Sequence, residues 1–201
     1  SPIFQNVIFS GNATPAVGFI VRGNMLITGT GAFTPTAGTV VFNGSGSQFI
    51  GGNTSVATTP TFRNVTVNKT SGDVVLLRNI RVDGVSTFAI TSGDVDLNGD
   101  RTISLIDDDA ILAETNGNTV KNTKSGLGFI QSGSTPSASQ LSSLGLHTIT
   151  GGVVGITRRY HSPISISGTS GISRYYEINF TVSDITDVDE LRFDNSELGS
   201  T

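Results

Sequence analysis

Short runs of apolar residues, each followed by a turn-forming residue, are the feature that most limits how this chain can fold. Such runs recur over roughly the first 120 residues and are separated by Gly, Asn, Ser and Asp. Most of them carry apolar side chains at alternate positions, which is the period of a β-strand. Examples are residues 40–42, 65–67, 80–82, 88–90 and 95–97. We therefore expect a fold built from many short strands.

The same order of residues occurs twice, which favours a solenoid over other all-β folds. Residues 4–9, FQNVIF, match residues 62–67, FRNVTV, at an offset of 58. Residues 38–44, GTVVFNG, match residues 93–99, GDVDLNG, at an offset of 55. We interpret each repeat as two or three coils of about 20 residues, stacked as a parallel β-solenoid. A β-sandwich uses strands of the same length and is the alternative.

Asn residues accompany the repeated strands and suit the corners between them. Asn tolerates left-handed backbone angles and forms hydrogen bonds with neighbouring peptide groups. Stacked Asn side chains can also form an amide ladder from one coil to the next. The residues expected at corners are Asn6, Asn43, Asn64 and Asn98.

The pattern changes near residue 125 and predicts a second module. Residues 137–144 predict a short helix that is capped by Ser137 and ended by Gly145. Longer alternating segments follow at residues 154–160, 174–182 and 191–193. Clean alternation predicts one buried and one exposed face, and hence an antiparallel sheet.

The predicted fold class is therefore all-β, with a parallel β-solenoid (β-helix) followed by a small antiparallel β-sandwich-like module. We assign solenoid repeats to residues 1–124 and the antiparallel module to residues 125–201. Because the chain starts at Ser1 without Met, we expect it to be a piece of a longer protein.

Composition and charge exclude several classes of protein. Charged residues make up 14% of the chain and the net charge is −4, so no basic stripe is present and nucleic acid is not expected as a partner. No apolar stretch approaches the roughly 20 residues of a membrane span. The absence of Cys excludes disulfides and thiolate chemistry. The 24 Ser and 26 Thr exclude a coiled coil, which needs Ala, Leu, Glu and Lys.

One acidic segment has the ligand spacing of a calcium loop. Oxygen ligands would stand at positions 1, 3, 5 and 12 of this loop, and the segment resembles a dockerin repeat. These ligands would be Asp96, Asn98, Asp100 and Asp107. Because Arg101 stands where the loop needs a Gly, and because the segment also aligns with the strand repeat, we predict no tight calcium there.

A second acidic segment consists of Asp107, Asp108 and Asp109. We favour a solvated loop between coils for these residues. A weakly bound surface calcium is one alternative, and a paired-carboxylate hydrolase site is another. Beyond such weak calcium, the sequence predicts no cofactor.

Basic and aromatic residues gather in two segments late in the chain. Guanidinium and aromatic groups together bind glycans or anions. The candidate ligand contacts are Arg158, Tyr160, Arg174 and Tyr175. The favoured interpretation is structural, with Tyr160 and Tyr176 in the core and the Arg residues bracing strands.

The order of several short motifs resembles large secreted surface proteins of Bacteroidota that are exported by the type IX secretion system. The resemblance covers about residues 60–199. Its motifs are FRNVTV (62–67), SGDVDLNGDRTISL (92–105), ETNGNTV (114–120), GFI (128–130), LGL (144–146), VGITRRYH (154–161), GISRYYEI (171–178) and LRFDNSELG (191–199).

The resemblance implies a non-enzymatic, extracellular structural or adhesive module on the bacterial cell surface. Adhesins and gliding-motility filaments are of this type, and the module would act as a stiff stalk. In the family the stretch that corresponds to SELG (196–199) continues into further strands, so the resemblance also implies that the second module is incomplete at Thr201. The implied partners are neighbouring repeats or modules of the same long protein, the secretion machinery and surface glycans. A glycan- or calcium-dependent binding module is the alternative, and a polysaccharide-degrading β-helix enzyme is the second alternative.

Overall fold

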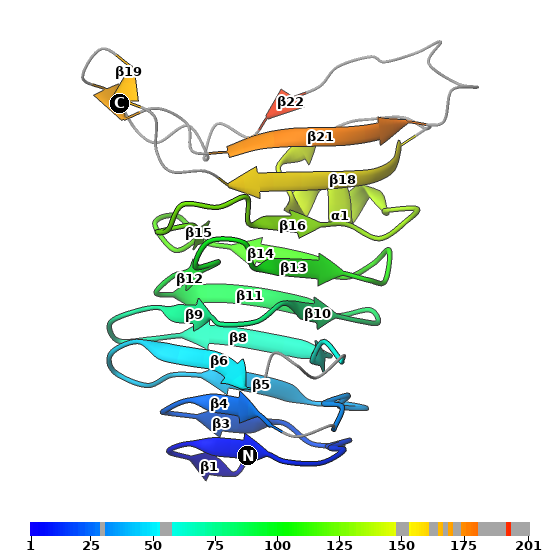
Figure 1. The fold of residues 1–201 in the computed structure, drawn as a ribbon. Coiled ribbons are helices and arrows are strands. Elements are labelled where there is room, and N and C mark those ends of the chain that lie inside the picture. Colours follow the sequence, from blue (N-terminus) through cyan, green and yellow to red (C-terminus); the bar gives the residue numbers. More distant parts are fainter. Residues whose placement is uncertain are drawn as a thin grey trace.

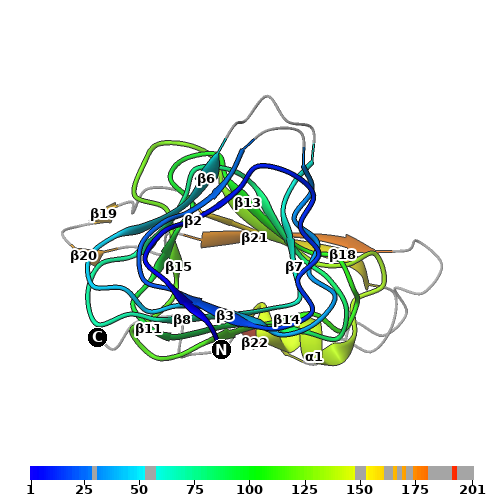
Figure 2. The same cartoon turned by 90° about the horizontal axis from the view of Figure 1, so that it is seen from below.

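Three sheets of short strands form the sides of a triangular column (Figures 1 and 2). The computed structural model describes residues 1–28, 31–52, 58–147, 153–160, 165–166, 169–170, 174–180 and 192–193. The chain passes from one sheet to the next, and we call each circuit of the three sheets a coil. From β5 (Thr39–Phe42) to β16 (Phe129–Gln131), each coil adds one strand to each sheet, so neighbouring strands of a sheet are far apart in the sequence. In the two coils before these, the third side is paired through the bridge between Ala13 and Phe33.

Each of the three sheets has six strands in the described part of the chain. Sheet A contains β1 (Ile3–Phe4), β3 (Phe19–Val21), β5 (Thr39–Phe42), β8 (Asn64–Asn68), β11 (Thr87–Ser92) and β14 (Ile111–Glu114). Sheet B contains β2 (Val7–Phe9), β4 (Met25–Ile27), β6 (Gln48–Gly52), β9 (Val74–Leu76), β12 (Val95–Asp96) and β15 (Val120–Lys121). Sheet C contains β7 (Thr61–Phe62), β10 (Ile80–Val82), β13 (Thr102–Leu105), β16 (Phe129–Gln131), β18 (Val153–Tyr160) and β21 (Arg174–Phe180).

Strand pairing confirms the parallel solenoid. In sheet A, Phe19 pairs in parallel register with Val40, and Val40 pairs in the same way with Val65. Val65 in turn pairs with Phe88 on the following strand. The positions of these partners in the sequence agree with the expected coils of about 20 residues. Because the spacing between successive partners varies, the corners absorb insertions while the strands stay in register.

Each repeated sequence segment corresponds to a strand and the corner beside it. The spacing between its two copies is not a whole number of coils. Residues 4–9 cross from sheet A to sheet B, whereas residues 62–67 cross from sheet C to sheet A. Similarly, residues 38–44 include β5 of sheet A, and residues 93–99 include β12 of sheet B. The offsets of 58 and 55 therefore fall between two and three coils. All three sides use the same local pattern, so a sequence match does not identify the side.

The apolar core fills the column from end to end. Ten residues predicted to be buried are all at most 3% exposed: Val40, Phe42, Val65, Val67, Ile80, Val82, Phe88, Ile90, Val95 and Leu97. Stacked rings extend this core through the first coils, since Phe9 and Phe33 have centroids 4.9 Å apart and Phe33 and Phe62 have centroids 5.2 Å apart. Burial of stacked apolar columns is the main stabilising term in such a fold.

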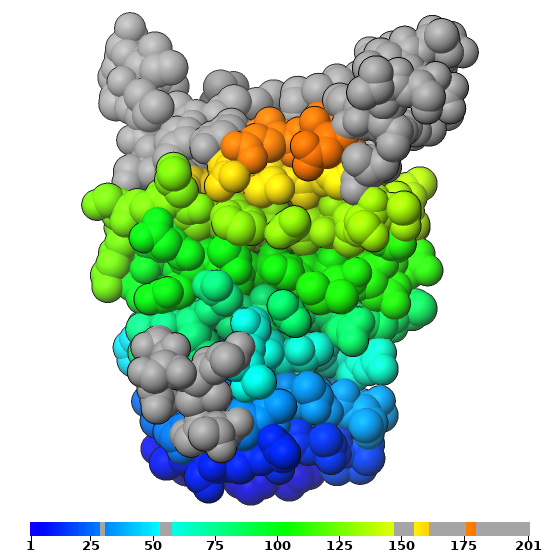
Figure 3. Space-filling view, turned by 45° about the vertical axis from the view of Figure 1, so that its right-hand side comes forward, coloured from blue at the N-terminus to red at the C-terminus, as the bar shows by residue number. Residues whose placement is uncertain are grey.

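The parallel pairing continues past the boundary expected near residue 125. Strand β16 still pairs parallel with β13. The antiparallel strands predicted from the alternation are present, because β18 pairs antiparallel with β16, and β21 pairs antiparallel with β18. They extend sheet C, so in the described residues they continue the column and do not build a separate sandwich. Figure 3 shows them, in yellow and orange, stacked on the last parallel coil.

Two small two-stranded sheets accompany this end of the column. Strand β17 (Leu146–His147) pairs antiparallel with β22 (Arg192–Phe193). Strand β19 (Ser165–Ile166) pairs antiparallel with β20 (Thr169–Ser170).

The predicted helix is present as α1 (Ala138–Ser143). Ser137 caps it by accepting a hydrogen bond from the Gln140 backbone N–H, and Gly145 ends it with a φ of 94°. The helix lies beside β14, where Ser143 accepts a hydrogen bond from the Leu112 backbone N–H. Thus α1 occupies the place at the edge of sheet A that a further strand would otherwise take.

Truncation of one inward side chain tests the continuity of the core. Phe42 is fully buried, so Phe42→Ala should lower the free energy of unfolding by about 3–5 kcal/mol, measured by chemical denaturation. Val85 is 83% exposed and serves as the control, because Val85→Ala should change the same quantity by less than about 0.5 kcal/mol. Equal effects of the two substitutions would contradict the column.

Candidate functional site

The corners of the column are held by side chains that reach from one coil to the next. The Asn6 side-chain oxygen accepts a hydrogen bond of 2.7 Å from the backbone N–H of Asn24. Asn24 accepts in the same way from Phe49 at 3.0 Å, and Asn64 accepts from Thr87 at 2.9 Å. The strand ladder is interrupted at corners, so these side chains satisfy backbone N–H groups that would otherwise lack a partner.

These contacts differ from the expected amide ladder, because each side chain binds the backbone of the next coil. The left-handed backbone expected of a corner Asn is present at Asn98, which has a φ of 52°. Its side-chain nitrogen donates to the Leu76 carbonyl at 3.1 Å. The side-chain oxygen of Asn43 is buried and has no hydrogen-bond partner among the described residues.

In the later coils, carboxylates serve at the corners beside amides such as those of Asn79 and Asn122. Asp94 accepts a hydrogen bond from the Thr119 N–H at 2.9 Å, and Asp100 accepts one from the Leu127 N–H at 2.8 Å. Asp96 is only 5% exposed and accepts hydrogen bonds from the N–H groups of Asn98 and Thr123. A carboxylate that receives several N–H donors is stabilised in its charged form.

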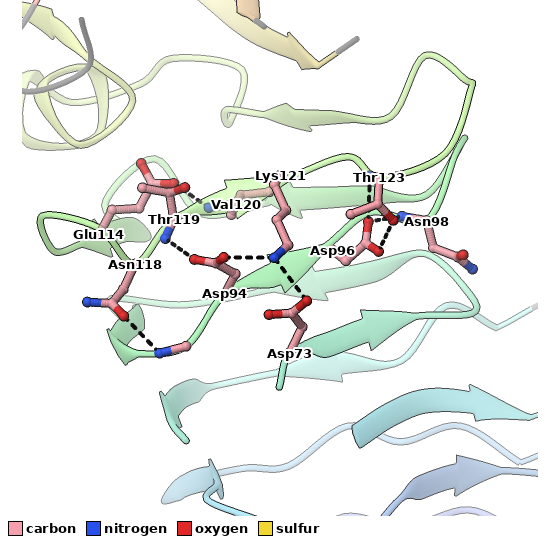
Figure 4. Close-up of polar contacts among 11 residues, drawn as sticks. Asp73, Asp94, Asp96, Asn98, Glu114, Asn118, Thr119, Val120, Lys121 and Thr123 are labelled. Carbon is pink, nitrogen blue, oxygen red and sulfur yellow. Dashed lines mark hydrogen bonds and ion pairs between the residues drawn. The ribbon is translucent and has the colours of Figure 1, made fainter. Parts of the chain in front are cut away.

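Lys121 connects three successive coils through an ion triad with Asp94 and Asp73, which we call the corner cluster (Figure 4). Its Nζ lies 2.8 Å from a carboxylate oxygen of Asp94 and 2.9 Å from one of Asp73. Burial opposes the positive charge of Lys121. Hydrogen bonds and Coulomb attraction from Asp94 and Asp73 outweigh this burial and raise its pKa. The sequence analysis missed this cluster, because the three residues are distant in the chain and meet only through the stacking.

A second missed group is a buried Lys69 beside Gln48. Lys69 is 2% exposed and donates hydrogen bonds to the Gly44 carbonyl at 3.0 Å and to the Gln48 side-chain oxygen at 2.8 Å. Burial lowers the pKa of Lys69, against the attraction of Asp73. The pair fastens the corner between sheets A and B from the inside.

The residues of the candidate calcium loop do not converge. The chain does turn sharply, but Asn98 and Gly99 make the turn with φ angles of 52° and 101°. Asp96 and Asp100 then face Thr123 and Leu127 of the next coil. The twelfth position, Asp107, lies beyond strand β13, at the next corner.

Asp107, Asp108 and Asp109 lie in a turn, as the favoured interpretation expects. Asp107 accepts a hydrogen bond from the Asp109 N–H at 3.0 Å. Asp108 accepts hydrogen bonds from the N–H of Thr135, at 3.0 Å, and from its hydroxyl. The hydroxyl and then the backbone N–H of Thr135 lower the pKa of Asp108. In the described parts of the chain, no three His, Cys, Asp or Glu residues gather into a metal-binding group.

Two of the four candidate ligand contacts lie in the interior. Arg158 is 0% exposed and Tyr160 is 1% exposed, so neither side chain reaches an external ligand. The ligand-contact alternative is therefore wrong for these two residues, and the favoured placement of Tyr160 in the core is confirmed. Arg158 lies 2.9 Å from the Glu114 carboxylate and 5.3 Å from the centre of the Tyr160 ring. The side chains of Arg174 and Tyr175 lie outside the described residues.

The Arg158–Glu114 pair lies where the antiparallel strands join the last parallel coil. Glu114 faces Ile90 in sheet A, at the inward position that apolar residues hold in the coils before it. A buried carboxylate needs a partner, and Arg158 from β18 supplies one. The antiparallel strands are thereby attached to the last parallel coil by charge as well as by backbone pairing.

Comparison of the chain with protein-family models, with curated proteins and with solved structures finds no match. None of the helices in the described ranges has the length and hydropathy that crossing a membrane requires. The chemistry of the polar groups above is therefore the basis for the functional argument. Most of them join one coil to the next.

Removal of the Lys121 charge tests the corner cluster. Lys121→Met leaves Asp73 and Asp94 facing each other, so we expect a loss of about 0.5–1 kcal/mol in unfolding free energy, because the pairs are part-exposed. The loss should shrink in concentrated salt. The stabilisation should be present below the ordinary lysine pKa of 10.5 and be lost as the pH rises through the raised value. Lys124→Met, at an exposed position, is the control. Equal losses of unfolding free energy in the two variants, both insensitive to salt, would refute the cluster.

The Thr135 hydroxyl can be tested by titration. In Thr135→Val, the pKa of Asp108 should rise but stay below the ordinary value of 3.8, because the backbone N–H still donates. The native carboxylate contributes stability above pH 3.8, which is lost as the pH falls through the lowered pKa. Carbon-detected NMR titration of the Asp side chains measures this shift. An unchanged pKa of Asp108 would show that the hydroxyl contact does not form.

Proposed function

We propose that this chain is a non-enzymatic structural module of a large bacterial cell-surface protein, and that it acts as a stiff segment of a stalk or filament. The observation that carries the proposal is the unbroken stack of parallel coils around one apolar core. In such a solenoid each coil contacts mainly its neighbours, so the fold forms a rod whose length grows with the number of coils.

The corner hydrogen bonds support a mechanical role. The parallel strand pairs and the corner contacts join one coil to the next, and the contacts at corners span 18 to 27 residues of sequence. Bending the column would stretch several of these bonds at once. The many Ser and Thr residues keep the outer surface polar with few charges, which suits a rod that must stay soluble among other surface molecules.

The first coil supports packing against a neighbouring repeat. Strands β1 and β2 are the outermost strands of sheets A and B. Phe4 holds an inward position and is 40% exposed, whereas its sheet neighbour Val21 is fully buried. Such edges accept a further strand readily.

The charge distribution favours a neutral partner at this edge. Arg22 is the one charged residue in positions 1–62, and the remaining acids and bases all come later. A further coil could therefore stack without repulsion. The proposed partners are accordingly neighbouring repeats of the same long protein, with export by the type IX machinery as the resemblance implies.

Labelling of intact cells tests the extracellular role. Antibodies against residues 1–147 should label intact cells that make the full-length protein, and in-frame deletion of this segment should remove its adhesive or gliding contribution. Label confined to permeabilised cells would overturn the proposal. So would polysaccharide hydrolysis that is lost when Asp107, Asp108 and Asp109 are all replaced by Asn, because this loss would identify the chain as an enzyme.

A further inference from the structure

A hollow on the outer side of sheet C is the feature that the stacking does not explain. It has a volume of about 240 Å³ and lies where strands β16, β18 and β21 meet. Strand β16 ends at Gln131, and the chain then turns away from β18, which continues beside β21. Ser132, the residue after Gln131, still contacts β18, since its hydroxyl accepts a hydrogen bond from the Ile156 N–H at 2.8 Å.

Two glycines leave the hollow open, and their structural reasons differ. A Cβ at Gly133 would lie 2.2 Å from a carboxylate oxygen of Asp108, so packing requires Gly at this position. A Cβ at Gly155 would meet nothing closer than the Asn179 side-chain nitrogen at 3.8 Å. The φ of Gly155 is also not in the left-handed range. Neither sterics nor backbone conformation therefore demands Gly at position 155.

The groups around the hollow are uncharged and suited to hydrogen bonding. Gln131 and Asn179 contribute exposed amides, and Ser134 contributes an exposed hydroxyl. None of these three side chains forms a hydrogen bond to another described residue. Nearly all other polar side chains described above connect two coils.

The charges around the hollow disfavour an anionic ligand. Arg159 binds Glu177 through two contacts of 2.6 and 2.8 Å, and its guanidinium lies 5.1 Å from the centre of the Phe129 ring. The hydrogen bond from Arg159 lowers the pKa of Glu177 and keeps the pair charged at neutral pH. The residues that line the hollow carry no charge of their own, and the Asp108 carboxylate beside Gly133 would repel an anion.

We propose that this hollow, bounded by Gln131, Gly155 and Asn179, is a binding site for one neutral saccharide unit. Amides and hydroxyls match the adjacent hydroxyls of a sugar, because each group can both donate and accept. The volume is below the roughly 300–1,000 Å³ of sites for drug-sized molecules, so a single ring fits and a longer glycan extends outside. The site goes beyond the stalk role and would allow the rod to contact surface glycans.

The alternative for Gly155 is a purely local role in the sheet. The pairing of β18 with β21 shifts register between Val153 and Gly155, and glycine is common at such irregularities. The two interpretations differ in what a larger side chain does. If Gly155 only serves the bulge, its replacement destabilises the fold. If it keeps the hollow open, replacement removes ligand binding and leaves the fold stable.

The test uses the whole 201-residue chain and saturation-transfer NMR with glucose, galactose, mannose, N-acetylglucosamine and cellobiose, and with glucuronate as the charged comparison. At least one neutral sugar should bind saturably and shift the amide signals of Gly155 and Asn179. Gly155→Val should weaken this binding at least about tenfold, which corresponds to the loss of one or two hydrogen bonds. Its melting temperature should stay close to that of the unchanged chain.

Gly11→Val is the matched control, because a Cβ at Gly11 meets no atom within 4 Å, and it should leave binding unchanged. If Gly155→Val fails to fold, Gln131→Leu combined with Asn179→Leu tests the same site at exposed positions and should also abolish binding. Three results would overturn the proposal: no saturable binding of any neutral sugar, binding that survives these changes, or tighter binding of glucuronate than of the neutral sugars.

Discussion

The backbone N–H groups at the corners are the constraint on which this column depends. Within a sheet, the backbone N–H groups of each strand form hydrogen bonds with carbonyl groups of the neighbouring strand, but this ladder stops wherever the chain changes direction. Asn and Asp side chains solve the problem by accepting from the next coil, as Asn6, Asn64 and Asp94 do. The same contacts fix how far each coil is rotated over the one before it. Parallel strands would otherwise be free to slip by two residues without exposing their apolar face.

Charge at the corners divides the column into two regions. The first coils use Asn and contain Arg22 as their one charge up to position 62, whereas later coils use Asp94, Asp96, Asp100 and Asp108 beside amides such as that of Asn122. Carboxylates bind N–H groups more strongly but repel one another when stacked. Lys121, between Asp73 and Asp94, offsets that repulsion. Sensitivity to salt should consequently be confined to the later coils.

Local sequence predicted the strands and their buried faces, because alternation depends only on neighbouring residues. The inward positions of Val65 and Phe88 and the cap at Ser137 were accessible in this way. The sequence does not show on which of the three sides of the column a strand lies, since all three sides share one motif. The partners of Lys121 and the pairing of Arg158 with Glu114 also escaped prediction. Both depend on which residues stacking brings together, and coil lengths that vary from corner to corner set that register.

A fold whose polar side chains mostly serve the stacking gives a simple way to search for function. The side chains of Asp96, Lys69 and Gln48 are fully engaged in holding coils together, so their replacement would report on stability first. The exposed amides of Gln131 and Asn179 form no hydrogen bond that joins coils among the described residues. Gly133 is explained by the approach of Asp108, but a Cβ at Gly155 would make only ordinary contacts, the nearest at 3.8 Å. Gln131, Gly155 and Asn179, whose identities the fold does not explain, therefore lie together on one side of sheet C. This shared location distinguishes a candidate recognition surface from the residues that only support the rod.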